Sequence, residues 1–216
     1  MFEKENTNPW LSIPASEYEG HMGPRGTDQL RVLNDIFRNV YRRVKPANLA
    51  VLGCAMGNGF EHIDRGLTQW TVGVDLNPRY LELARRRYAH LLQTIELRCA
   101  NLSNLNFEAQ SFDMIHAALI FEYLDIEAAM AKFAAWLAPE GVLSVVLQEP
   151  STDETTVSHT QYNSMQTLVD TIELIRPEAL EETANQAGLL TLQTNEISLR
   201  HGKKFYTAMF MKQLRT

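Results

Sequence analysis

The feature that most constrains this chain is a glycine-rich bend between two apolar segments, the second of which ends in a carboxylate. Gly53, Gly57 and Gly59 follow the apolar run 49–52, and Asp75 lies 22 residues after Gly53. Glycine adds no Cβ and tolerates positive φ, so such a bend lets backbone amides approach a bound ligand. This spacing is close to that at which dinucleotide-type folds place an acid on a ribose. The pattern therefore predicts a nucleoside-containing cofactor.

Composition limits the class of protein. The chain has 216 residues, of which 45% are hydrophobic, enough for one well-packed domain. Its apolar runs are short and its first residues are polar, which predicts a cytoplasmic protein with no membrane span and no secretory signal. A net charge of −6 works against a nucleic-acid partner. Cys54 and Cys99 lack metal-ligand spacing, so we expect two reduced thiols and no metal site.

The order of elements predicts a single α/β domain in consecutive segments. An N-terminal arm and a cap helix occupy 1–46, and the glycines and prolines of the arm predict little regular structure before residue 27. Strands and helices alternate over 47–150, which form the cofactor-binding core. Residues 151–176 form a substrate-side insertion, and 177–216 a final helix and β-hairpin. The expected fold is a Rossmann-like, doubly wound, mostly parallel seven-stranded sheet with an antiparallel last strand.

Periodicity and caps place the elements of this fold. We expect strands at 49–52, 71–75, 95–99, 112–119, 142–147, 189–197 and 205–212. We expect helices from Thr27 to Pro46, at 59–67, from Asn77 and Pro78 onward, at 126–137, at 166–175 and at 177–188.

With these elements in order, residues 49–212 resemble the class I S-adenosylmethionine-dependent methyltransferases of the small-molecule type. That family usually ends its first strand with an acid, one residue, then Gly-x-Gly-x-Gly. Here Val51 occupies the acidic position and Ala55 that of the middle glycine. Because no acid stands at Val51, the ammonium group of the cofactor must be held by carbonyls of the bend at Gly53 or by groups of the N-terminal arm.

The later motifs of the chain carry the resemblance further. Val74-Asp75-Leu76 resembles the motif in which the carboxylate accepts hydrogen bonds from the ribose hydroxyls and the next residue touches adenine. Ala100-Asn101-Leu102 matches the adenine clamp, 111–119 the strand beneath the methionine portion, and 137–143 the family's Leu-x-Pro-Gly-Gly connection. The resemblance implies S-adenosylmethionine as cofactor, S-adenosylhomocysteine as product, and cofactor-binding roles for Gly53, Ala55, Gly57, Gly59, Asp75, Leu76, Asn101, Leu102 and Ala117.

Methyl transfer from a sulfonium is a displacement on an activated carbon, so positioning supplies much of the catalysis. A general base is needed only for a protonated acceptor. The arm carries Tyr18, His21 and Met22, which we expect at the cofactor or acceptor pocket with His21 as the base. The alternative is that Tyr18 and Met22 only anchor the arm on the core.

Two further regions supply candidate substrate contacts. Glu122 and Tyr123 follow the fourth strand, at the edge where open α/β sheets bind ligands. Either residue faces the acceptor, or Glu122 caps the following helix and Tyr123 packs beneath it. Tyr162 of the insertion is the other substrate candidate.

The sequence therefore predicts an enzyme of EC 2.1.1 type that methylates a small molecule. One alternative is a catalytically silent relative that binds S-adenosylmethionine or S-adenosylhomocysteine. A more distant alternative is a nicotinamide-dependent oxidoreductase, whose Gly-x-Gly-x-x-Gly pattern is not met here, because His62 stands where the third glycine would follow Gly57 and Gly59.

Overall fold

The computed structural model of the chain describes residues 8–149 and 156–213. Its strands form one seven-stranded sheet in the order β3-β2-β1-β4-β5-β7-β6. The strands are β1 Asn48–Leu52, β2 Trp70–Asp75, β3 Ile95–Cys99, β4 Phe112–Ala118, β5 Leu137–Gln148, β6 Leu189–Ser198 and β7 Lys204–Lys212. β1 to β5 pair in parallel, and β7 runs antiparallel to both β5 and β6. The predicted mostly parallel sheet with an antiparallel last strand is confirmed.

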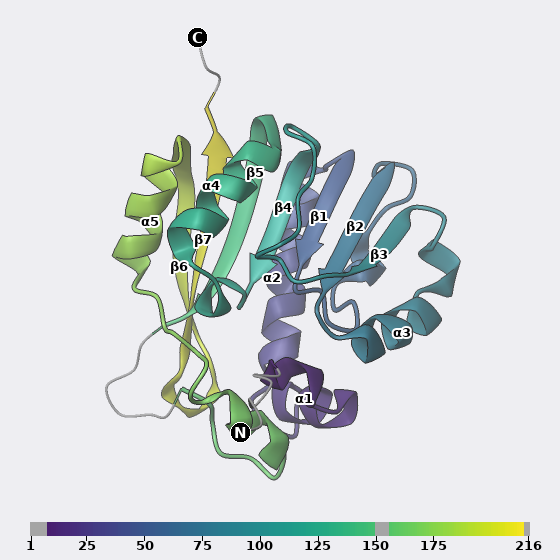
Figure 1. Cartoon of the computed structure of the whole chain (residues 1–216), viewed down its shortest axis with the longest axis vertical. Coiled ribbons are helices and arrows are strands. Elements are labelled where there is room, and N and C mark those ends of the chain that lie inside the picture. The colour runs from purple at the N-terminus through teal and green to yellow at the C-terminus, as the bar shows by residue number, and fades with distance from the viewer. Residues whose placement is uncertain (1–7, 150–155, 214–216) are drawn as a thin grey trace, which may run out of the picture.

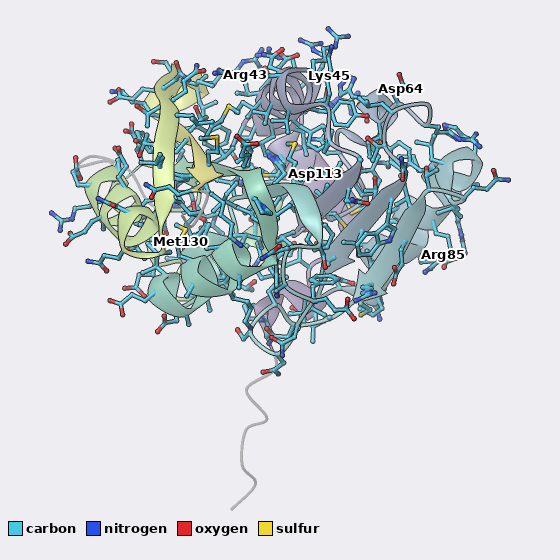
Figure 2. All side chains as sticks on the ribbon, turned by 90° about the horizontal axis from the view of Figure 1, so that it is seen from above. Arg43, Lys45, Asp64, Arg85, Asp113 and Met130 are labelled. Atoms are coloured by element: carbon cyan, nitrogen blue, oxygen red, sulfur yellow. The ribbon has the colours of Figure 1, made fainter. Side chains whose placement is uncertain are left out.

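Helices cover both faces of the sheet (Figure 1). They are α1 Ala15–Met22, α2 Gln29–Val44, α3 Pro78–Arg87, α4 Ile126–Trp136 and α5 Pro177–Gln186. α4 and α5 lie on one face, and α2 lies on the other. Figure 2, which looks down on the molecule from above, shows Met130 of α4 on the first side and Arg43 near the end of α2 on the second. The carboxyl ends of the parallel strands all meet at the edge beside α1 (Figure 1).

Burial explains why these segments form the elements they do. Parallel strands are covered on both faces and are therefore continuously apolar, as in β1, where four of the five residues are buried. α2 instead carries a one-sided stripe of buried residues that includes Leu33, Phe37 and Tyr41. The predicted start of α3 is confirmed, because the Asn77 side chain accepts a hydrogen bond from the backbone N–H of Arg79 at 2.9 Å, with Pro78 in the first turn.

The expectation that the arm has little regular structure is wrong for its described part. Residues 9–11 form a 3₁₀ helix, and α1 begins directly after Pro14. Proline at a helix start costs no hydrogen bond. Within α1, Gly20 leaves room for the Tyr162 ring, which packs where a side chain at position 20 would lie. Residues 1–7 of the arm and 151–155 of the insertion lie outside the described residues.

Four other local expectations need correction. The segment after the bend is a single 3₁₀ turn, Phe60–His62, because Ile63 leaves it in extended conformation. The insertion likewise contains a 3₁₀ helix at Asn163–Leu168 instead of an α-helix at 166–175. Thr27 does not cap α2: its hydroxyl donates to the carbonyl of His21, and Asp28 precedes the helix with positive φ. β5 also begins earlier than expected, directly after α4.

Candidate functional site

A cavity opens at the edge where the parallel strands end. Segments from the whole length of the chain contribute to it: the arm, the start of α2, the ends of β1 to β5, the insertion and the turn before β7. Among the predicted site residues, those that line it are Tyr18, His21, Met22, Gly53, Ala55, Asp75, Leu76, Asn101, Leu102 and Tyr123. This edge is the usual ligand position in open α/β sheets.

Asp75, at the end of β2, fixes the glycine bend. Its Oδ2 accepts a hydrogen bond from the backbone N–H of Ala55 at 2.8 Å, and its Oδ1 accepts one from Asn77 at 2.8 Å. Burial raises the pKa of this carboxyl, although the backbone N–H groups of Asn77, Ala55 and Leu76 oppose the rise. Each carboxylate oxygen has two lone pairs, so each keeps one for a hydroxyl donor in the cavity.

The bend meets the cavity through Gly53, Cys54 and Ala55 and again through Asn58. Gly53 has φ of 68°, and a Cβ added there would lie 2.5 Å from Cδ1 of Ile120. Gly57 and Gly59 do not line the cavity, because they turn toward aromatic rings: Gly57 toward Phe60 and Tyr88, and Gly59 toward Phe37. Ala117 is also absent from the cavity, since its side chain is fully buried in the core on the α4 side of the sheet. These three predicted cofactor-binding positions therefore lie outside the residues that line the cavity.

Leu76, Asn101 and Leu102 form one end of the cavity beside Asp75. The Asn101 side-chain carbonyl accepts a hydrogen bond from the backbone N–H of Ser103 at 2.9 Å, which leaves it one further lone pair. Apolar side chains therefore flank a short polar edge, as a flat heterocycle with an exocyclic amino group would require.

The arm closes over this end. Asn77 Nδ2 donates to the carbonyl of Trp10 at 2.9 Å, and Tyr80 Oη donates to the carbonyl of Ile13 at 3.0 Å. The Tyr18 ring lies 5.6 Å from the Tyr80 ring, in contact range for aromatic side chains. The arm thus contributes cavity wall and is also anchored to α3, so both functions that the sequence left open are present.

His116, in the middle of β4, is a cavity residue that the sequence analysis did not single out. It pairs in register with Val51, which stands at the position where the resembled family carries an acid. Its Nδ1 lies 3.0 Å from the Ser144 hydroxyl, and burial lowers its pKa to about 4. The imidazole is therefore neutral at physiological pH. A histidine inside an otherwise apolar strand was the signal that could have identified it.

Glu122 lies beyond the end of β4 and is only 3% exposed. Its Oε1 accepts the backbone N–H of Gln148 at 2.9 Å, and its Oε2 is buried without a hydrogen-bond partner. Burial raises the pKa of this carboxyl to about 7, although the hydrogen bond from Gln148 opposes the rise. Glu122 does not cap α4, since the Asp125 side chain accepts from the Ala128 N–H there. Of the two functions that the sequence left open, the structure favours a cavity residue.

His21 is buried in the cavity wall with its Nδ1 2.9 Å from the Thr160 hydroxyl. Burial and the nearby positive charge of Lys203 lower the pKa of His21 to about 4. Lys203, itself a cavity residue, donates to the carbonyl of Thr156 at 3.0 Å. No local motif marked Lys203 or Gln148, because the fold alone brings the start of β7 beside the end of β5.

The two remaining substrate candidates, Tyr123 and Tyr162, lie in different places. Tyr123 lines the cavity and packs its ring 5.4 Å from that of Trp10. Tyr162 does not line it, because its ring lies on α1 at Gly20.

Within 8–149 and 156–213, no cluster of His, Cys, Asp and Glu is placed to hold a metal ion. The same ranges contain no helix that is both long and apolar enough to cross a membrane.

A stability measurement can test the state of Glu122. Because its folded-state pKa lies above the unfolded value, the carboxyl favours folding below pH 4.5, and this advantage is lost as pH rises through about 7. The free energy of folding lost between the unfolded pKa of 4.5 and the folded pKa of about 7 is about 3 kcal/mol. We expect Glu122→Gln to be more stable than the parent by about 2 to 3 kcal/mol at about pH 8 and nearly equal to it at about pH 4.5, measured by urea unfolding. A difference that does not change with pH would contradict the raised pKa.

Comparison with known proteins supports the class of protein indicated by this geometry. Residues 50–141 match the family model described as a methyltransferase domain. N-methyltransferase NodS from Bradyrhizobium japonicum, solved with S-adenosyl-L-homocysteine, is 17% identical, with a TM-score of 0.63 over 81% of this chain and 85% of that one. A phosphoethanolamine N-methyltransferase from Haemonchus contortus is 15% identical, with a TM-score of 0.69 over 93% of this chain and 57% of that one. No curated protein sequence matches the chain significantly.

The fold is also shared with a protein of another activity. The cyclase SpnF is 15% identical, with a TM-score of 0.62 over 78% of this chain and 76% of that one. At these identities the structural likenesses show the fold alone. The match of residues 50–141 shows a methyltransferase domain in this part of the chain, and the solved structures show that its fold is the one found in S-adenosylmethionine-dependent methyltransferases.

Proposed function

We propose that this protein transfers a methyl group from S-adenosylmethionine to a small molecule. The observation that carries the proposal is one cavity lined by Asp75 on the β2 side of β1, its first end, and by the buried carboxylate of Glu122 on the β4 side, its second end. The first end suits a nucleoside, and the second is a separate polar site that adenosine does not need. Protein-sized or nucleic-acid acceptors are disfavoured because the arm and the insertion both border the cavity.

The residues of the first end fit the cofactor that the family implies. The lone pairs left on Asp75 suit the two ribose hydroxyls, and Leu76 and Leu102 suit the faces of adenine. Gly53 offers a backbone surface free of side chain, which the methionine portion requires. When bound, S-adenosylmethionine supplies a methyl group activated by its sulfonium.

The ammonium group of the cofactor has candidate partners despite Val51. We propose that the Gly53 carbonyl and the neutral His116 ring accept its hydrogen bonds, since both line the cavity beside Val51. Tyr18 and Met22 then exclude water from this part of the cavity. Low water content strengthens these polar contacts and prevents hydrolysis of the activated methyl group.

His21 is the base candidate from the sequence, but a positioning role fits its surroundings better. A group with a pKa of about 4 takes up a proton poorly at neutral pH. We expect His21→Ala to lower the turnover number by less than about 10-fold, because general bases contribute about 100-fold or more. The measurement is formation of S-adenosylhomocysteine at saturating cofactor, with His90→Ala, a histidine outside the cavity, as the matched control. A loss of 100-fold or more would restore His21 as the base.

Calorimetry distinguishes this proposal from its alternatives. The purified chain is titrated with S-adenosylmethionine and S-adenosylhomocysteine and then incubated with a metabolite pool, with formation of S-adenosylhomocysteine as the readout. Binding with turnover supports the enzyme. Binding without turnover supports a silent binder or another reaction on this fold, and no binding overturns both readings.

The segment after the glycine bend argues against the alternative of a nicotinamide-dependent oxidoreductase. A pyrophosphate site needs the N-terminus of a helix directly after the glycine bend. Here a 3₁₀ turn, Phe60–His62, follows the bend.

The cytoplasmic location stays a prediction that cell fractionation would test.

A further inference from the structure

The Glu122 carboxylate is a polar group of the cavity that cofactor binding leaves unexplained. It is 3% exposed, and one of its two oxygens, Oε2, has no hydrogen-bond partner. A buried carboxylate oxygen without a partner costs free energy comparable to a lost charged hydrogen bond. An unpartnered buried carboxylate oxygen is typical of a site in which a bound ligand supplies the missing hydrogen bond.

The surroundings of Glu122 limit the answer. Asp75 and the adenosine-type surfaces lie on the β2 side of β1, whereas Glu122 follows β4 on the other side. The wall near Glu122 is formed by Gln148 and by apolar side chains of the insertion, among them Val157, Met165 and Leu168. The Lys203 ammonium also lines the cavity and donates, like the Gln148 side chain, to the carbonyl of Thr156. An acidic group set against apolar walls favours a ligand that brings one cationic or strongly donating group and little other polarity.

We propose that Glu122 binds the amino group of the methyl acceptor and takes up its proton, so that the acceptor is an amine. This inference rests on the proposed function. The ammonium form of the acceptor donates N–H to Oε2 and pairs its charge with the carboxylate. A charge-assisted hydrogen bond of this kind is about twice as strong as a neutral one.

The proton transfer accounts for the choice of an amine over an alcohol or phenol. A proton that passes from an ammonium ion to Glu122 leaves two neutral groups, which a buried site of low dielectric favours. A proton taken from a hydroxyl would only move the negative charge to the acceptor oxygen. Burial holds the pKa of Glu122 at about 7, so the carboxyl can gain and release a proton near neutral pH.

Atoms, electrons and charge are all conserved in the full transfer. The proton leaves the acceptor nitrogen for Glu122 Oε2, and the freed lone pair of nitrogen forms the new C–N bond. As it forms, the carbon–sulfur bond breaks and its electron pair stays on sulfur, which loses its positive charge. The methylated amine carries that charge away as an ammonium ion. Glu122 returns its proton to solvent, so no oxidant or other reactant is required.

The test uses matched pairs of probes on the full chain saturated with S-adenosylhomocysteine. The pairs are ethanolamine and ethylene glycol, glycine and glycolate, and benzylamine and benzyl alcohol. Each is titrated by calorimetry in two buffers of different ionisation enthalpy, which reports proton transfer independently of turnover. We expect at least one amine to bind about 10-fold or more tightly than its hydroxyl partner.

Substitutions then assign the preference to Glu122. Glu122→Gln keeps the size of the side chain and an oxygen for the Gln148 N–H, and it should reduce the amine preference by about 10-fold or more. Glu127→Gln, which removes an exposed carboxylate from α4, makes the same change in charge and should leave the preference intact. Thermal melting and S-adenosylhomocysteine titration show that each variant is folded.

The outcomes separate the two proposals. No S-adenosylhomocysteine binding by the parent chain overturns the proposed function. Normal binding with no amine preferred over its hydroxyl partner overturns the amine inference alone. A preference that survives Glu122→Gln also overturns it, because another group would then be responsible.

Discussion

Asp75→Ala is expected to weaken S-adenosylhomocysteine binding by about 100-fold or more. Two hydrogen bonds from ribose hydroxyls to a charged acceptor contribute at least about 3 kcal/mol together, which is a factor of about 100 in the dissociation constant. The same carboxylate also accepts the backbone N–H groups of Ala55 and Asn77, so the bend should loosen as well. Calorimetric titration with S-adenosylhomocysteine measures the change in affinity.

The control must separate lost ligand contacts from lost stability. Asp113 offers a match, because its Oδ2 accepts the backbone N–H of Asn48 at 2.7 Å and it lies at the start of β4, outside the residues that line the cavity. We expect Asp113→Ala to lower the free energy of unfolding by about 1 to 3 kcal/mol without changing affinity. If Asp75→Ala bound S-adenosylhomocysteine within about 5-fold of the parent, Asp75 would not be the ribose ligand.

The sequence predicted the elements whose signals are local. The Asn77-Pro78 start of α3 and the apolar strands each follow from neighbouring residues. Asp75 could also be placed, because the carboxyl ends of parallel strands share one edge and a residue closing β2 must lie there. These features need no knowledge of distant contacts.

The sequence failed where distant segments decide the structure. α1 depends on contacts with the insertion: Tyr162 packs on Gly20, and Glu17 accepts the backbone N–H of Ser164 at 2.9 Å. No local pattern could show that Tyr162 serves this packing and not the cavity. Tertiary contacts override local preference in such cases.

Glu122 shows the same limit at the site itself. Its position before α4 allowed a capping role as readily as a ligand contact. The choice depended on Asp125, which caps the helix, and on Gln148, which reaches Glu122 only after β5 has paired with β4. The sequence could list the candidate groups, but their protonation follows from burial that only the assembled fold creates.

Gly53→Ala is expected to lower both stability and cofactor affinity, for two separable reasons. An L-residue at φ of 68° costs about 1 to 2 kcal/mol, and the new Cβ would lie 2.5 Å from Ile120 Cδ1, so one of the two segments must shift at a further cost of about 1 to 3 kcal/mol. Ile120 and Gly53 both line the cavity, so the shift should also weaken S-adenosylhomocysteine binding by about 10-fold or more.

Gly188→Ala isolates the backbone contribution to this effect. Gly188 has φ of 79°, and a Cβ added there meets no atom within 4 Å, so this variant carries the conformational strain without the collision. It should lose about 1 to 2 kcal/mol and keep normal affinity. The double variant Gly53→Ala, Ile120→Ala removes the colliding atoms, and we expect it to regain most of the affinity lost by Gly53→Ala. If the double variant binds no better than Gly53→Ala, the close approach of Ile120 is not what requires glycine, and the backbone conformation of the bend alone controls the site.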